Sequence, residues 1–244
     1  MLRLRVIGTG SSGNCYLLTD VDSATGQPRD ALLLDAGVTP IQRISKAIYE
    51  ARPAQVRGCL VTHEHGDHAA AVRGLSMMGI PCYGTPGTVE AVGQEMRPMH
   101  LYKPLEIGSF YVLAFPTNHN AREPCGFLIN SLRTGERLIY ATDTYYLSHK
   151  YPGVHYWLIE CNYCQELVTD GAPPDLEHRH MSLDRLSGVF EANDLRACRK
   201  IILCHMSRER GDKGRMVQTI HDVAHKPVIM AEPGQTYELN LDPF

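Results

Sequence analysis

The chain has 244 residues, which is enough for one large domain or two small ones. Hydrophobic residues make up 43% of it and charged residues 21%, a balance that predicts a sizeable core and argues against disorder. The formal net charge of −3 excludes a broadly basic nucleic-acid-binding surface, although a local groove could still gain positive charge from metal ions.

The start of the sequence and its cysteines predict the compartment. Met1 to Val6 is too short and too charged for a secretory signal, and no apolar run approaches membrane-spanning length. Eight cysteines are scattered along the chain, so we expect free thiols in a reducing cytoplasm and no contact with a membrane. Cys161 and Cys164 form a lone Cys-x-x-Cys motif without the helix opening of a redox site, and are predicted to be packing residues.

The first predicted strand leads into a glycine-rich turn. Leu2, Leu4 and Val6 alternate with arginines, as in a strand with one buried face. Gly8 to Asn14 contains the dinucleotide fingerprint G-x-G-x-x-G, but that fingerprint must open a helix, and Cys15 to Leu18 reads as another strand. The turn therefore predicts either an anion site made of backbone N–H groups or a plain tight hairpin.

A polar surface turn is expected over Asp20 to Asp30. The apolar segment Ala31 to Leu34 follows as a buried strand and ends in Asp35. Thr39 is then expected to cap a helix that has Pro40 at its first position.

The next buried strand, Gly58 to Val61, runs into a histidine-rich motif, after which helical spacing resumes. A helical zinc site needs two histidines four apart, whereas His63 and His68 are five apart. The motif instead lies on a strand-to-helix turn, where His63 and His65 could bind one ion while Asp67 and His68 bind a second. Imidazoles and carboxylates are suitable ligands for zinc, manganese or iron.

An apolar strand followed by a ligand-type side chain is a pattern that recurs along the chain. The residues at these strand ends are His63, His119, Asp143, Glu160 and His205. Because sites in layered α/β folds collect at strand ends, we expect these side chains to lie together. The other expected elements are helices after Thr85, from Ser182 to about Asn193 and over Gly214–Ala224; hairpins over Leu105–Phe115 and Phe127–Tyr140; and strands over Trp157–Ile159, Ile201–Cys204, Pro227–Met230 and Thr236–Leu239.

These residues together resemble the metallo-β-lactamase fold. The order of the His-x-His-x-Asp-His motif, His119, Asp143 and His205 carries the resemblance, which covers nearly the whole chain. It implies one hydrolase domain over residues 1–244, an α/β four-layer αββα sandwich with two metal ions, zinc or manganese, at one edge.

The resemblance also implies a ligand set. One ion would be bound by three histidines, the second by an aspartate and two histidines, and a further aspartate would bridge them. In that order the residues are His63, His65 and His119; Asp67, His68 and His205; and Asp143. Asp35 would support the site from outside the metal ligands.

Further features resemble the YycJ/WalJ-type exonuclease branch, which is related to the tRNA-processing ribonuclease Z. They are Asp143 in place of a ligand cysteine, Gly10-Ser11-Ser12-Gly13-Asn14, His180-Met181-Ser182 and His205-Met206-Ser207. The branch implies a dyad of Glu160 and His180 outside the metal ligands. Two departures concern substrate choice: Asn120 stands where relatives often carry an acid, and Arg208-Glu209-Arg210-Gly211 replaces an asparagine-rich continuation.

The leading hypothesis is a phosphodiesterase that acts on DNA rather than RNA, as an exonuclease. Two ions would lower the pKa of a shared water, Asp67 would orient the resulting hydroxide, and His180, held by Glu160, would protonate the leaving group. The alternative for Glu160 and His180 is an ordinary surface salt bridge. The rival functions are a hydrolase of small esters, thioesters or lactones on the same fold and a non-catalytic metal- or redox-binding module.

Overall fold

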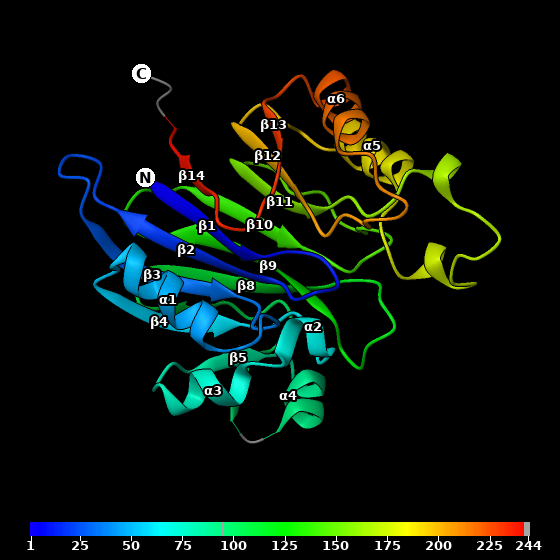
Figure 1. Ribbon diagram of the computed structural model, residues 1–244. Helices are drawn as coiled ribbons and strands as arrows, with labels where there is room; N and C mark the ends of the chain where they lie inside the picture. The colour runs from blue at the N-terminus through cyan, green and yellow to red at the C-terminus, as the bar shows by residue number, and fades with distance from the viewer. Residues whose placement is uncertain (94, 242–244) are drawn as a thin grey trace.

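The computed structural model, which describes residues 1–93 and 95–241, contains two seven-stranded β-sheets packed face to face (Figure 1). The first sheet has the strand order β14-β1-β2-β3-β4-β5-β6 and the second has the order β13-β12-β11-β10-β9-β8-β7. The strands of the first sheet are β1 Leu2–Gly8, β2 Cys15–Val21, β3 Pro28–Leu34, β4 Gln55–Leu60, β5 Cys82–Gly84, β6 Met96–Pro98 and β14 Thr236–Leu239. Those of the second are β7 Leu105–Ile107, β8 Phe110–Pro116, β9 Cys125–Ser131, β10 Arg137–Ala141, β11 Tyr156–Glu160, β12 Lys200–Cys204 and β13 Val228–Met230.

Helices cover the outer face of each sheet, which gives the four-layer αββα sandwich that the resemblance implied. In the described chain four α-helices pack on the first sheet and two on the second. Figure 1 shows the two groups on opposite sides of the sandwich. They are α1 Gln42–Ala51, α2 Gly66–Ala69, α3 Val72–Met77 and α4 Pro86–Val92 on one side, and α5 Leu183–Ala192 and α6 Lys213–Ala224 on the other. Two short 3₁₀ helices, η1 Gln165–Leu167 and η2 Leu176–His178, lie in the segment between β11 and α5.

The alternation of the sequence accounts for the three apolar layers. Leu2, Leu4 and Val6 point between the sheets and pack against residues such as Phe127 and Leu158 of the facing sheet. The strands that are apolar on both faces, for example β11, also bury residues against the helices. Burial on both faces is typical of parallel strands covered by helices, and β10, β11, β12 and β13 pair in parallel.

The predicted elements are present, with three local corrections. Asp20 is not part of a surface turn: it is buried in β2, where its carboxylate accepts hydrogen bonds from the hydroxyls of Ser109 and Ser131. Helix α1 begins at Gln42 with Ile41 at its N-cap, so Thr39 is not the cap. The helix expected after the histidine motif is divided into α2 and α3.

In the described parts of the chain, no helix combines the length and the apolar character that a membrane crossing requires.

Candidate metal centre and catalytic site

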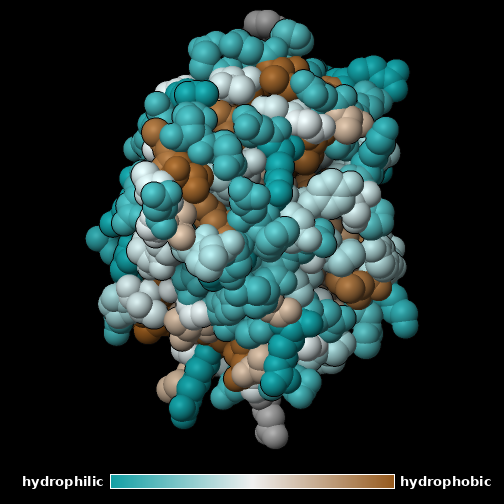
Figure 2. All heavy atoms as spheres, turned by 90° about the vertical axis from the view of Figure 1, so that its right-hand side faces the viewer, coloured by the Kyte–Doolittle hydropathy of each residue, from teal (hydrophilic) through white to brown (hydrophobic). Residues whose placement is uncertain are grey.

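The candidate site lies where strands from both sheets end at one edge of the sandwich. His63 follows β4 of the first sheet, whereas the other four strand-end residues belong to the second sheet. His119, Asp143 and His205 follow β8, β10 and β12, and Glu160 is the last residue of β11. Figure 2 views the molecule from the right-hand side of Figure 1 and shows a mainly hydrophilic surface interrupted by separate hydrophobic patches.

Close backbone packing brings α2 to this edge. Asp67 and His68 lie within this short helix, and the carbonyl oxygen of Asp67 accepts a hydrogen bond from the amide of Asn14 at 2.7 Å. The backbone of Gly37 passes so near that an added Cβ would lie 1.7 Å from the Asp67 carbonyl oxygen. A glycine at position 37 therefore allows the β3–α1 connection to support the metal-ligand motif.

Three non-glycine residues at strand ends have left-handed backbone conformations. The φ angles are 58° for Asp35, 47° for Asp143 and 53° for His205. Such conformations cost of order 1–3 kcal/mol each and concentrate at functional sites, because the surrounding structure must hold them. All three side chains point into the polar cluster described below.

The first group of candidate ligands contains three histidines. His65 Nδ1 lies 3.1 Å from His63 Nε2 and 3.3 Å from His119 Nε2. Three imidazole nitrogens from β4 and β8 connections therefore converge on one point, as a tetrahedral or five-coordinate ion requires.

The second group contains two aspartates and two histidines. His68 Nε2 lies 3.4 Å from Asp67 Oδ2, and His205 Nε2 lies 3.7 Å from the same oxygen. His68 Nε2 is also 3.4 Å from Asp143 Oδ2. These four residues place their ligand atoms within 4.8 Å of one another.

One carboxylate oxygen faces both groups. Asp143 Oδ2 lies 3.5 Å from His119 Nε2 and 3.9 Å from His63 Nε2 in the first group, and 3.4 Å from His68 Nε2 in the second. A single buried oxygen at hydrogen-bond or near-contact distance from both sets of imidazoles has the position that a bridging ligand needs.

Neighbouring acceptors orient several imidazoles so that their Nε2 atoms face the centre. The Nδ1 atom of His68 is 2.8 Å from Asp35 Oδ2, that of His119 is 2.9 Å from the Arg179 carbonyl, and that of His205 is 3.0 Å from Glu160 Oε1. Donation from Nδ1 leaves the Nε2 lone pair available, which is the usual arrangement around metal-binding histidines. Among the described residues His205 Nε2 is buried without a hydrogen-bond partner, so the donor set fits divalent cations.

Asp35 anchors this arrangement from the interior. Its carboxylate accepts the backbone N–H of Thr62 at 2.8 Å, the Thr62 hydroxyl at 3.0 Å and the Tyr140 hydroxyl at 2.6 Å, in addition to His68. The fully buried carboxylate thus links β3, β4 and β10 directly behind the site. This position agrees with the supporting role expected for Asp35.

Glu160 contacts both His180 and His205. Its Oε1 lies 2.7 Å from His180 Nδ1 and 3.0 Å from His205 Nδ1, while Oε2 accepts the amides of Thr144 and Met181 at 2.9 and 3.2 Å. Both carboxylate oxygens are therefore occupied by protein donors. Glu160 is completely buried and the His180 side chain is 16% exposed, which rules out an ordinary surface salt bridge.

The electrostatics of the site follow from buried charge of both signs. Burial disfavours the ionised form of Asp143, but the His205 and His68 imidazoles outweigh it and hold the pKa of Asp143 well below its usual value. Burial likewise opposes protonation of His205, yet the Asp143, Asp67 and Glu160 carboxylates raise the His205 pKa to about 10. His63 lacks an equally close carboxylate, and burial together with neighbouring His68 lowers its pKa. Carboxylates that stay ionised while buried create the negative potential that attracts a cation.

All the predicted site residues are brought together: His63, His65, Asp67, His68, His119, Asp143, Glu160, His180 and His205. The sequence reasoning did not assign Asn162, which is buried and donates to the His205 carbonyl at 2.8 Å, or Asn14, whose amide lies 3.1 Å from His68 Nε2. The sequence signal that could have identified Asn162 is its position, two residues after Glu160 at the end of a strand. The glycine-rich turn is a hairpin between β1 and β2, and the amides of Gly10, Gly13 and Asn14 already donate to protein acceptors.

Comparison with known proteins agrees with this geometry. Residues 30–206 match the family described as "Beta-lactamase superfamily domain". The chain is 26% identical over 232 residues to the exodeoxyribonuclease WalJ of Streptococcus pneumoniae, an alignment that covers 85% of this chain and 82% of WalJ. The expected resemblance to the WalJ-type branch is thereby confirmed.

Solved structures show the same fold at lower sequence identity. The metallo-β-lactamase fold protein YhfI from Bacillus subtilis superimposes with a TM-score of 0.72 at 16% identity, over 97% of this chain and 98% of YhfI. The short form of human tRNase Z gives a TM-score of 0.64 at 15% identity, over 98% and 99% of the two chains.

Proposed function

Because the chain belongs to the β-lactamase superfamily and has the metallo-β-lactamase fold, we propose that it is a metal-dependent phosphodiesterase that degrades DNA from an end. The observation that carries this proposal is the position of Asp143 Oδ2, within 3.9 Å of imidazole nitrogens from both ligand groups. A carboxylate shared by two groups favours a dinuclear centre over a single-ion site. Relatives named exodeoxyribonuclease favour DNA over RNA as the substrate.

Each predicted ligand has a role in this proposal. One divalent cation, zinc or manganese, would be held by three histidines, the other by one aspartate and two histidines, with an aspartate between them. The residues in that order are His63, His65 and His119; Asp67, His68 and His205; and Asp143. The cations would supply Lewis-acid polarisation of a phosphoryl group and an activated water.

Asp67, which is itself a ligand, and His180, which is not, would then orient the water and supply the proton. The Asp67 side chain is 25% exposed, so its carboxylate can orient a water at the open side of the centre. Burial disfavours protonation of His180, but the Glu160 carboxylate outweighs it and raises the His180 pKa, which favours the protonated imidazole that a proton donor needs. The His180 and His205 rings stack with centroids 5.4 Å apart, so the donor lies directly beside the ligand groups.

A digestion assay tests the function. Purified protein supplemented with Mn²⁺ or Zn²⁺ is incubated with end-labelled single- and double-stranded DNA and RNA, and the products are sized. Mononucleotides released from DNA from the earliest time points support an exonuclease. Internal fragments would show that cleavage is internal and does not start from an end. Faster degradation of RNA would show that RNA and not DNA is the substrate. Intact nucleic acid under every metal condition would refute the proposal.

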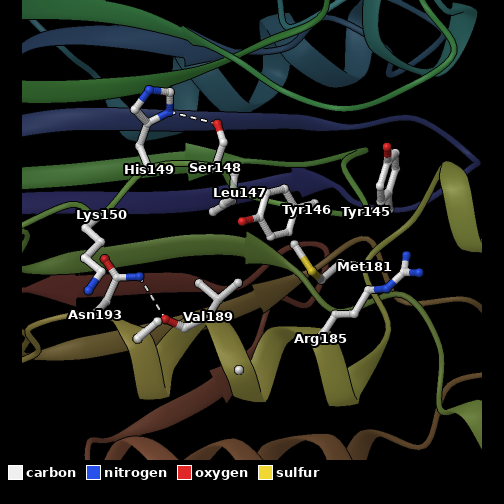
Figure 3. A pocket seen from close by; sticks show the side chains of 12 residues that line it. Tyr145, Tyr146, Leu147, Ser148, His149, Lys150, Met181, Arg185, Val189 and Asn193 are labelled. Carbon is white, nitrogen blue, oxygen red and sulfur yellow. Dashed lines mark hydrogen bonds between the residues drawn. The ribbon is translucent and has the colours of Figure 1, made fainter.

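A second candidate, a hydrolase of small esters or thioesters, is favoured by one observation. A cavity of about 430 Å³ lies between α5 and the segment that follows Asp143 (Figure 3). Tyr145, Leu147, Met181 and Val189 give it an apolar lining that could take an acyl chain. Turnover of nitrophenyl acyl esters at rates above those on phosphodiesters would select this candidate.

A further inference from the structure

A second cavity, of about 370 Å³, opens beside the candidate centre on the side of His180. The glycine-rich turn, the segment before α5 and the segment after β12 all contribute to its wall. Its polar lining residues include Ser11, Arg179, His180, His205, Arg208 and Arg210. Its volume is within the range of small-molecule sites, and the presence of His180 and His205 makes it continuous with the centre.

The three arginines of this cavity have unused capacity to bind an anion. The Nε atoms of Arg179 and Arg210 are buried without a hydrogen-bond partner in the described chain, and Arg208 has no ion pair there. Arg179 contacts Asp175 at 3.5 Å and Arg210 contacts Glu209 at 3.2 Å, but these acids are 50% and 77% exposed. Exposed pairs of this kind are worth little, so they do not satisfy the guanidinium groups.

The backbone holds the segment after β12 in place before any ligand arrives. The Arg210 amide donates to the Ser207 hydroxyl at 3.2 Å, the Gly211 amide donates to the Ser207 carbonyl at 3.0 Å, and the Arg210 carbonyl accepts the Cys164 amide at 2.8 Å. A preorganised turn loses little conformational entropy when its side chains bind an anion. A planar guanidinium fork also matches the geometry of a phosphate.

We propose that Arg179, Arg208 and Arg210 bind the phosphate that neighbours the scissile phosphodiester on its leaving-group side. The proposal rests on the function proposed above, in which His180 protonates the leaving oxygen. Because His180 lines the same cavity, a phosphate bound there would lie on the side to which the leaving group departs.

Binding of a nuclease-resistant probe tests the phosphate site without turnover. The probe is a short phosphorothioate single strand with a 5′-phosphate, a 3′-phosphate or hydroxyls at both ends, and affinity is read by fluorescence anisotropy over a salt series. Arg208→Gln and Arg210→Gln should each weaken binding about tenfold, because each removes a hydrogen bond between charged groups. The slope of log affinity against log salt should fall by about 0.7 for each lost phosphate contact.

The matched control is Arg196→Gln, which removes the same charge from the connection between α5 and β12, at the opposite end of β12 from His205. Arg210→Lys should restore the salt slope but not the full affinity, since lysine keeps the charge and loses the fork. A preference for one phosphorylated end identifies a terminal phosphate as the ligand. Equal loss with all three probes identifies an internal one. Wild-type affinity in both glutamine variants, or the same loss in Arg196→Gln, would overturn the proposal.

Hydrolysis assays distinguish a failure of the proposed phosphate site from a failure of the proposed nuclease function. The glutamine variants should lower kcat/KM about tenfold on DNA but leave bis(p-nitrophenyl) phosphate unaffected, because its leaving group carries no second phosphate. Equal losses on both substrates would overturn the assignment to the leaving-group side. If the wild type binds the probe through these arginines yet cleaves no nucleic acid, the phosphate site stands and the nuclease function fails.

Discussion

Replacing His180 with alanine isolates the proposed proton donor from the rest of the site. The imidazole is held mainly by one contact, its 2.7 Å hydrogen bond to Glu160 Oε1. After the substitution Glu160 still accepts hydrogen bonds from Thr144, Met181 and His205, so the buried carboxylate keeps three donors. Loss of one charged hydrogen bond should cost about 2 kcal/mol of stability, a change that leaves the fold intact.

The expected kinetic effect is larger than the effect on stability. General-acid catalysis contributes about 10²- to 10⁴-fold, or about 3–5 kcal/mol of barrier at 1.36 kcal/mol per decade. His180→Ala should lower kcat on DNA by that factor. On a nitrophenyl phosphodiester the loss should shrink to within about threefold, because nitrophenolate departs without a proton.

Steady-state kinetics on both substrates, combined with elemental analysis, decide the role of His180. Metal content should match the wild type, and His221→Ala, which alters an exposed histidine on α6, should leave both activities unchanged. Equal losses on the two substrates would refute the general-acid role and make His180 a residue that positions phosphate. An unchanged rate on both would remove the dyad from the mechanism.

Three other predictions concern the metal centre, the fold and the thiols. Protein purified without chelator should contain about two equivalents of transition metal, and Asp143→Ala should lose more of it than His63→Ala; one equivalent or fewer after reconstitution contradicts a dinuclear centre. Gly37→Ala should destabilise the fold by at least about 3 kcal/mol in urea unfolding, because its Cβ would overlap the Asp67 carbonyl. Gly188→Ala, whose Cβ would have nothing within 4 Å, should stabilise α5 by about 0.5–1 kcal/mol. Similar unfolding midpoints for the two variants would contradict the close approach of Gly37 to Asp67. All eight cysteines are buried, and burial raises the pKa of thiols such as Cys15 and Cys204. A disulfide reagent at mildly alkaline pH should therefore react slowly with the native chain, and should modify all eight thiols once the chain is unfolded. Rapid reaction with the native chain would contradict this prediction.

The strand ends show how far the sequence determines this architecture. Apolar runs that stop at His63, His119, Asp143 and His205 predicted both the strands and their meeting point, because strand direction sends polar ends to one edge. Asp20 was misassigned for the complementary reason. Its burial depends on Ser109, in the turn between β7 and β8, and on Ser131 in β9, and local polarity does not indicate such distant partners.

The finer geometry of the site depends on contacts between distant segments. The sequence does not show that His65 approaches its neighbours with Nδ1, or that the Arg179 carbonyl orients His119. It also does not show that Asn162 holds the backbone of His205 in its left-handed conformation. Each of these features depends on segments that follow β4, β8, β11 and β12, which meet at one edge only in the folded sandwich.

The shared position of Glu160 changes what its replacement should do. A simple dyad predicts that Glu160→Gln weakens proton donation and nothing else. Glutamine, however, has an NH₂ group, which must face either the backbone amides of Thr144 and Met181 or the two imidazoles. Both pairs of groups donate hydrogen bonds to Glu160, so the NH₂ group meets donors in either orientation. Since backbone amides cannot change their protonation, the NH₂ group should turn to the imidazoles.

The consequence for His205 is specific. Its Nδ1 would then have to accept, which moves the proton to Nε2, the atom expected to bind a cation. Glu160→Gln should therefore lower metal affinity about 10- to 100-fold, as the loss of an outer hydrogen bond to a ligand histidine does, while His180→Ala should not. Isothermal titration with Mn²⁺ measures both variants. Equal affinity in the two would show that Glu160 does not orient His205, and would leave the carboxylate with His180 as its one functional partner.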